Sequence, residues 1–119
     1  MSYDLDIWEA DRTRSDADHW YELDRINEDQ SERILKGAKP YPLPPSSKIS
    51  DFTQALLRRW PEDEEDSPWS CGGAGDADGS FVCVRIQWGR EDEVSAFVAG
   101  LAKVYGLVCH DRQTGRFRP

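Results

Sequence analysis

The residues that could support catalysis are Cys109 and His110, which are adjacent, and His19, which lies among acidic residues. A thiol beside an imidazole is the pairing that activates a cysteine nucleophile. However, residues 107–110 have the composition of a strand, in which neighbouring side chains point to opposite faces of a sheet. Cys109 and His110 are therefore badly placed to share a proton or a ligand. Because the chain holds 23 acidic residues, an acid near a histidine is expected by chance, and we predict no catalytic residue.

Metal and phosphate sites are disfavoured by residue spacing. Cys71, Cys83 and Cys109 lack the paired spacing that is typical of zinc sites. The glycine-rich stretch 72–79 leads into a strand and carries aspartates, whereas a phosphate-binding loop carries Gly-Lys-Ser/Thr and leads into a helix. The same stretch lacks the closing glutamate of a calcium loop. We therefore predict no metal and no cofactor, and we expect the cysteines to be structural thiols.

An acidic stretch between Trp60 and Ser80 has a functional interpretation. Five consecutive acids are followed by a tryptophan, which is typical of interface hot spots, and by two more aspartates. Charged residues at the rim of an interface speed association. The alternative is a solvated loop that contributes only solubility. The predicted partner-binding residues are Glu62, Asp63, Glu64, Glu65, Asp66, Trp69, Asp76 and Asp78.

The overall charge restricts the class of partner. The chain has 119 residues, a formal net charge of −8 and a sequence pI of about 4.7. Nucleic acids and anionic membranes attract basic surfaces, so neither is an expected partner, whereas a basic protein is. The first residues show neither a basic segment nor an apolar one, and the chain has no run of about 18 apolar residues. We therefore expect a cytoplasmic protein with reduced cysteines.

The first half of the chain predicts one strand and a helical region. Residues 3–8 alternate as a half-buried strand. Ser15 is a plausible N-cap for a helix, or for two short ones, that ends before Gly37. The proline-rich residues 39–45 should run extended as a stiff connector. A second helix is expected to begin at Ser50 and to end at Pro61. The apolar face of this second helix comprises Ile49, Phe52, Leu56 and Trp60.

The second half predicts two more strands, a helix and a turn. Residues 81–88 alternate as the strongest strand, and Trp69-Ser-Cys71 is expected to pair with it weakly. A helix over 91–105 ends before Gly106, and residues 107–110 form a short strand. A turn at 113–116 precedes a basic tail. The apolar stripe of the 91–105 helix comprises Val94, Phe97, Val98, Leu101 and Val104.

These elements predict a single α+β domain over residues 1–119. Their order is β-α-β-β-α-β, the ferredoxin-like pattern. We expect an antiparallel sheet of about four strands with helices on one face. The other face would carry Arg85 and Gln87 and remain open to solvent or to a partner.

Both ends of the chain carry sequence motifs of a known kind. The opening MSYDLDIW and the closing YGLVCHDRQTG resemble those of a group of small bacterial proteins, which begin with an MSYDL-type strand and end with a GL-x-x-YDPQ-type strand and turn. Here His110 and Arg112 stand where that pattern has Tyr and Pro. Some members resemble immunity proteins encoded beside polymorphic toxins. The resemblance implies a cytoplasmic, non-catalytic α+β protein and does not identify its partner. Our leading interpretation is an immunity-type protein that neutralises a cognate, basic, secreted toxin domain by occluding its active site. The alternatives are an unrelated adaptor module and, third, a small enzyme using Cys109 or His110.

Overall fold

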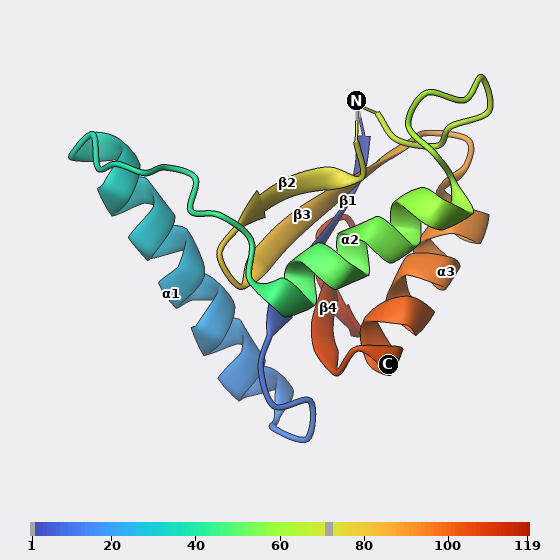
Figure 1. The fold of residues 1–119 in the computed structure, drawn as a ribbon. Coiled ribbons are helices and arrows are strands. Elements are labelled where there is room, and N and C mark those ends of the chain that lie inside the picture. The colour runs from blue at the N-terminus through green and yellow to red at the C-terminus, as the bar shows by residue number, and fades with distance from the viewer. Residues whose placement is uncertain (1, 71–72) are drawn as a thin grey trace.

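The computed structural model describes residues 2–70 and 73–119, so Cys71 lies outside the described part of the chain. This part forms three helices and an open antiparallel sheet of five strands in the order β2-β3-β1-β4-β5 (Figure 1). No helix in residues 2–70 or 73–119 has the length and apolar character that a membrane crossing requires. The elements are β1 (Ser2–Glu9), α1 (Asp16–Leu35), α2 (Ser47–Arg59), β2 (Gly75–Asp78), β3 (Phe81–Gln87), α3 (Glu91–Val104), β4 (Leu107–Asp111) and β5 (Arg116–Arg118).

The predicted α+β class is confirmed, but the number and order of the elements differ from the prediction. Two helices stand between β1 and β2, where the ferredoxin-like pattern has one. The basic tail, for which no strand was predicted, pairs with β4 as β5. The expected turn before it is present, and Gly115 adopts a φ of +69° there.

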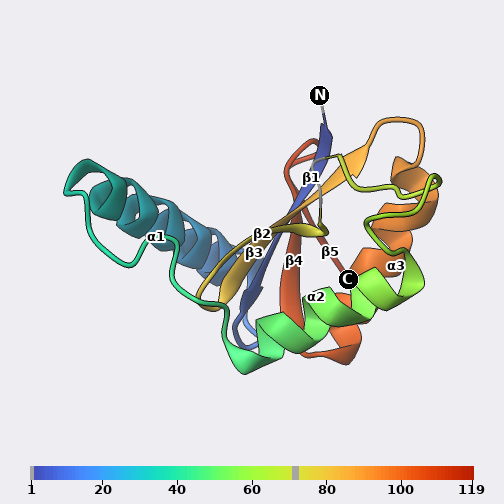
Figure 2. The same cartoon turned by 45° about the horizontal axis from the view of Figure 1, so that its top comes forward.

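The helices lie on both faces of the sheet, so the expectation that they cover one face is wrong (Figure 2). α2 and α3 cover the face that carries Leu5, Ile7 and Val84, and together they form the main core. α1 covers part of the opposite face, where Leu23 packs in a smaller cluster with Trp8. The alternation of β1 therefore separates two apolar clusters rather than a core face from a solvent face.

Local sequence signals fix the helix ends. The Ser15 hydroxyl accepts a hydrogen bond from the Asp18 amide, as predicted for the N-cap of α1. The Gly37 and Ala38 amides donate to the last carbonyls of α1 in the Schellman pattern. The N-cap of α2 is Ser46 rather than Ser50, because the Ser46 hydroxyl accepts from the Ile49 amide. The predicted apolar face of α2 is confirmed, since all four of its members are buried.

The strand that pairs with the far edge of β3 is not the one predicted. β2 lies inside the glycine-rich stretch and joins β3 through the two residues Gly79 and Ser80. Gly79 has a φ of +62°, which suits the first central position of a type II′ hairpin turn. Trp69 makes only an isolated bridge to Ile86.

Candidate partner-binding surface

The predicted acidic loop, residues 62–66, lies at one end of the molecule beside the turn between β3 and α3 (Figure 1). Two contacts hold it there. The Arg90 guanidinium donates to the Asp66 carbonyl oxygen at 2.6 Å. The Gln87 amide donates to the Pro68 carbonyl oxygen at 2.7 Å. The loop therefore has a defined position on the sheet rather than a free path between α2 and β2.

The carboxylates of this loop are joined by a second acidic group. All five side chains of residues 62–66 are exposed, and Glu91, Asp92 and Glu93 occupy the adjacent first turn of α3. We call residues 62–66 and 88–93 the acidic end; Arg90 is its one basic residue. Within residues 2–70 and 73–119, no ion pair involves a carboxylate of the acidic end. Its negative charge is therefore free to act on a partner.

Trp69 belongs to the core rather than to this surface. Its side chain is 4% exposed, and its Nε1 donates to the Trp60 carbonyl oxygen at 2.8 Å. The rings of Trp60 and Trp69 meet edge to face at 6.1 Å. In this structure Trp69 offers no open indole face to a partner. The anchor role that we predicted for it therefore needs another residue.

Asp76 and Asp78 lie on β2, which runs from the acidic end toward α1 (Figure 1). Asp78 is almost fully buried and accepts hydrogen bonds from Arg33, from Gln30 and from the Leu43 amide. The hydrogen bond from Arg33 is the largest of the effects that lower the pKa of Asp78. Asp76 is exposed and pairs with Arg85 at 3.2 Å. The structure thus gives Asp78 a clear structural role and separates both aspartates from the acidic loop.

Trp88 is an exposed aromatic residue of the acidic end that the sequence did not reveal. Its side chain is 48% exposed. Strict alternation would place it on the buried face with Val84 and Ile86. However, β3 ends at Gln87, and Gly89 turns the chain with a φ of +100°. The clue in the sequence is the glycine directly after Trp88, because strand parity no longer applies beyond a turn.

The face of the sheet under α1 carries a row of polar side chains. Asp6 lies between Cys83 on β3 and His110 on β4. The Arg112 guanidinium donates to Asp6 at 2.6 Å, and His110 Nδ1 lies 3.4 Å from the same carboxylate. Burial raises the pKa of the Cys83 thiol. Asp6 thus separates the thiol from the imidazole, and this row does not form the direct Cys–His contact of a nucleophilic pair.

Cys109 faces the main core, on the side of the sheet opposite to His110, as the alternation of β4 predicts. It is 1% exposed, and burial raises the pKa of its thiol to about 12. A neutral, enclosed thiol is a poor nucleophile. His110 is itself enclosed by the rings of Trp20 and Phe117, at 4.7 and 5.1 Å. The predicted geometry of these two residues is therefore confirmed.

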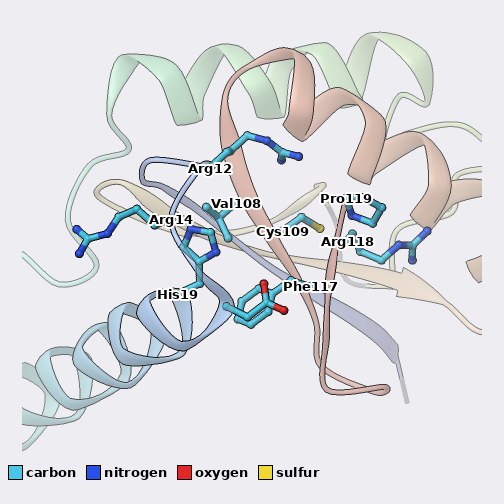
Figure 3. Close-up of a pocket in the computed structure, with 9 residues that line it drawn as sticks. Arg12, Arg14, His19, Val108, Cys109, Phe117, Arg118 and Pro119 are labelled. Atoms are coloured by element: carbon cyan, nitrogen blue, oxygen red, sulfur yellow. The ribbon is translucent and has the colours of Figure 1, made fainter.

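Several hollows lie along α1 in the described part of the chain. A groove of about 370 Å³ lies between α1, β2 and β3, and it exposes both signs of charge through Asp76 and Arg85. A pocket of about 230 Å³ near the start of α1 is lined by Arg12, Arg14 and Arg118. Figure 3 shows Arg14 and Arg118 directed to opposite sides of this pocket. Their guanidinium groups do not converge, so the pocket is not an anion cradle.

The two terminal motifs meet in space. The Tyr3 hydroxyl donates to the Asp111 carboxylate, and the Asp4 amide donates to the Gln113 side chain at 2.7 Å. The Gln113 amide group returns a bond to the Asp4 carbonyl oxygen at 2.9 Å. Together these residues join the first strand to the last turn. No protein-family model matches the chain, and comparisons with curated proteins and with solved structures return no significant match.

Proposed function

We propose that this chain is a small immunity-type protein that binds a cognate, basic, secreted toxin domain in the cytoplasm and neutralises it by occluding its active site. The observation that supports the proposal is the acidic end. Its carboxylates are exposed, apart from that of half-buried Glu91, and free of ion pairs among the described residues, whereas Asp6, Asp78 and Asp111 elsewhere are paired. A concentration of unneutralised charge attracts an oppositely charged partner and raises its association rate.

The exposed aromatic side chain of Trp88 gives this surface an apolar element within its charged surroundings. Interfaces commonly combine an aromatic anchor with a polar rim. Residues 62–66 supply the rim in this proposal, and Trp88 takes the anchor role first assigned to Trp69. Burying such an anchor mainly slows dissociation, while the rim mainly speeds association.

The test begins with the product of the neighbouring gene. Co-expression of the chain should protect cells from that product, and the two purified proteins should form a stable complex. Protection that fails, together with the absence of a complex, would leave the adaptor alternative in place.

Binding kinetics then locate the surface on the chain. Replacing Asp63, Glu64 and Glu65 with Asn, Gln and Gln should slow association at low salt and weaken its dependence on ionic strength. Trp88→Ala should speed dissociation instead. The matched control combines Asp24→Asn, Glu28→Gln and Asp51→Asn, which also removes three charges, from exposed positions on α1 and α2. If the control slows association as much as the acidic-end variant, only net charge matters and the acidic end is not the binding surface.

A further inference from the structure

We infer that the exposed ring of Trp88 is a stacking platform for an arginine side chain of the partner. This inference rests on the proposed function and names the chemical group that the acidic end would recognise. The ring offers an open aromatic face, its position is fixed by a neighbour, and the charge around it selects a cation.

The ring of Trp88 is exposed and held in place. Its edge-to-face contact with Tyr3 has a centroid distance of 5.6 Å and an interplanar angle of 83°. Tyr3 is itself fixed through its hydroxyl, which donates to Asp111. A side chain that is already ordered loses less conformational entropy when a partner covers it.

The surroundings of the ring are negative. Burial, the hydrogen bond to Asp111 and the charge of Asp111 raise the pKa of the neighbouring Tyr3 to about 12, although the charge of Arg118 opposes this rise. Three acidic residues, Glu91, Asp92 and Glu93, follow Trp88 within five residues along the chain, in the first turn of α3. No described cation stacks on Trp88, and the nearby Arg90 donates to the Asp66 carbonyl oxygen. The platform thus has its complementary charge but no cation of its own.

A guanidinium suits this platform better than an ammonium does. It stacks flat on an aromatic ring and still directs its N–H groups at carboxylates in the same plane. Among the described residues an arginine lies over an aromatic ring in three pairs, and the two closest are as follows. Arg59 lies 4.2 Å from the Trp60 ring centroid, and Arg33 lies 5.0 Å from that of Tyr41. In both cases the ring and the cation belong to this chain, whereas Trp88 leaves the place of the cation open.

Two synthetic peptides of equal charge, hexa-arginine and hexa-lysine, test the inference on the full chain. At low ionic strength both should bind, and hexa-arginine should bind about 2- to 5-fold more tightly, the ratio expected of one exposed cation–π contact. Hexa-arginine should also shift the indole N–H resonance of Trp88 more than hexa-lysine does. Calorimetry and nuclear magnetic resonance measure these two effects.

Variants separate the platform from the charge. Trp88→Leu should remove the preference by lowering the affinity for hexa-arginine more than that for hexa-lysine. Trp20→Leu, at a tryptophan that is 41% exposed on α1, is the matched control and should keep the preference. Equal affinity of the wild type for both peptides, or a preference that survives Trp88→Leu, overturns the inference and leaves the proposed acidic surface standing. If neither peptide binds, the inference and the attraction of the acidic end for cations both fail.

Discussion

Replacing Asp111 with alanine should destabilise the fold by about 3–5 kcal/mol, the range for removing one partner from a buried charged network. The Asp111 side chain is 2% exposed. It accepts hydrogen bonds from the Tyr3 hydroxyl and from the Gln113 and Thr114 amides, at 3.1 and 3.2 Å for the amides. Hydrogen bonds to a charged group contribute about 1.5–3 kcal/mol each and are not additive. The expected loss is a large share of the 5–15 kcal/mol typical of a domain.

Asp111→Asn is the matched control. The Oδ1 atom of Asp111 accepts from both turn amides, whereas Oδ2 faces Tyr3. An asparagine oxygen can keep the turn, so we expect a loss of only about 1–2 kcal/mol from the altered contact with Tyr3. Urea denaturation measures the two losses. The ratio of the two losses in unfolding free energy shows whether the turn amides or the Tyr3 contact contribute more to stability.

A second readout isolates the Tyr3 contact. The pKa of Tyr3, about 12, is raised first by burial and then by Asp111. In Asp111→Asn the charge is gone, so the pKa of Tyr3 should fall while the share due to burial remains. Ultraviolet titration of the phenol measures the shift. A loss below about 1 kcal/mol in Asp111→Ala, or an unchanged Tyr3 titration in Asp111→Asn, would refute the view that this carboxylate joins the two ends of the chain.

Three further predictions follow from burial and pairing. The folded state lowers the pKa of Asp78, so its contribution to stability is present above about pH 4, the unfolded pKa, and is lost as pH falls through the folded pKa. In Asp78→Asn the free energy of unfolding should therefore fall less steeply toward acid pH. Urea unfolding from pH 2 to 7 measures this dependence, and a variant curve parallel to that of the wild type would contradict the prediction. Val98 is fully buried, so Val98→Ala should lower the free energy of unfolding by about 2 kcal/mol. Phe97 is 36% exposed, so Phe97→Ala should cost less than the ~3–5 kcal/mol that a fully buried phenylalanine would lose. Chemical denaturation measures both losses, and a loss of ~3–5 kcal/mol at Phe97 would support the apolar stripe predicted from sequence instead. The thiol of Cys109 lies in the main core and should react with a maleimide only after global unfolding, whereas Cys83 lies under α1 and should react earlier, when that helix opens. Mass mapping that finds Cys109 labelled as early as Cys83 would contradict this order.

The elements that local sequence determines were predictable. The N-cap Ser15, the stop at Gly37 and the apolar face of α2 depend on neighbours within a few residues, and each is confirmed. The alternation that separates Cys109 from His110 is equally local and also holds.

The pattern on α3 shows why hydrophobicity alone was insufficient. The helix buries the small residues Ser95, Ala99 and Ala102 together with Val94 and Val98, and it leaves Val104 80% exposed. Small side chains permit a close approach of a helix to its neighbours, but a ranking by hydrophobic size overlooks them. The predicted stripe was therefore displaced around the helix.

The candidate site was predicted only in part, because its composition depends on contacts between distant segments. The position of residues 62–66 beside α3 requires Gln87, at the end of β3, and Arg90, in the turn that follows. The burial of Trp69 depends on Trp60 and on the bridge to Ile86. The negative charge of residues 62–66 follows directly from composition, but the sequence could not show that Trp69 lies in the core and Trp88 on the surface.

The way α1 is attached has a consequence for the dynamics of the molecule. Of its 20 residues, only His19 and Leu23 are buried. Toward its C-terminal end, the contact with β2 depends on the buried carboxylate of Asp78. A helix with so little apolar burial is expected to open at a lower free energy than the sheet with α2 and α3. The amides of α1 should therefore exchange earlier than those of the sheet, α2 and α3. Opening of α1 would expose Cys83 and His110 without global unfolding.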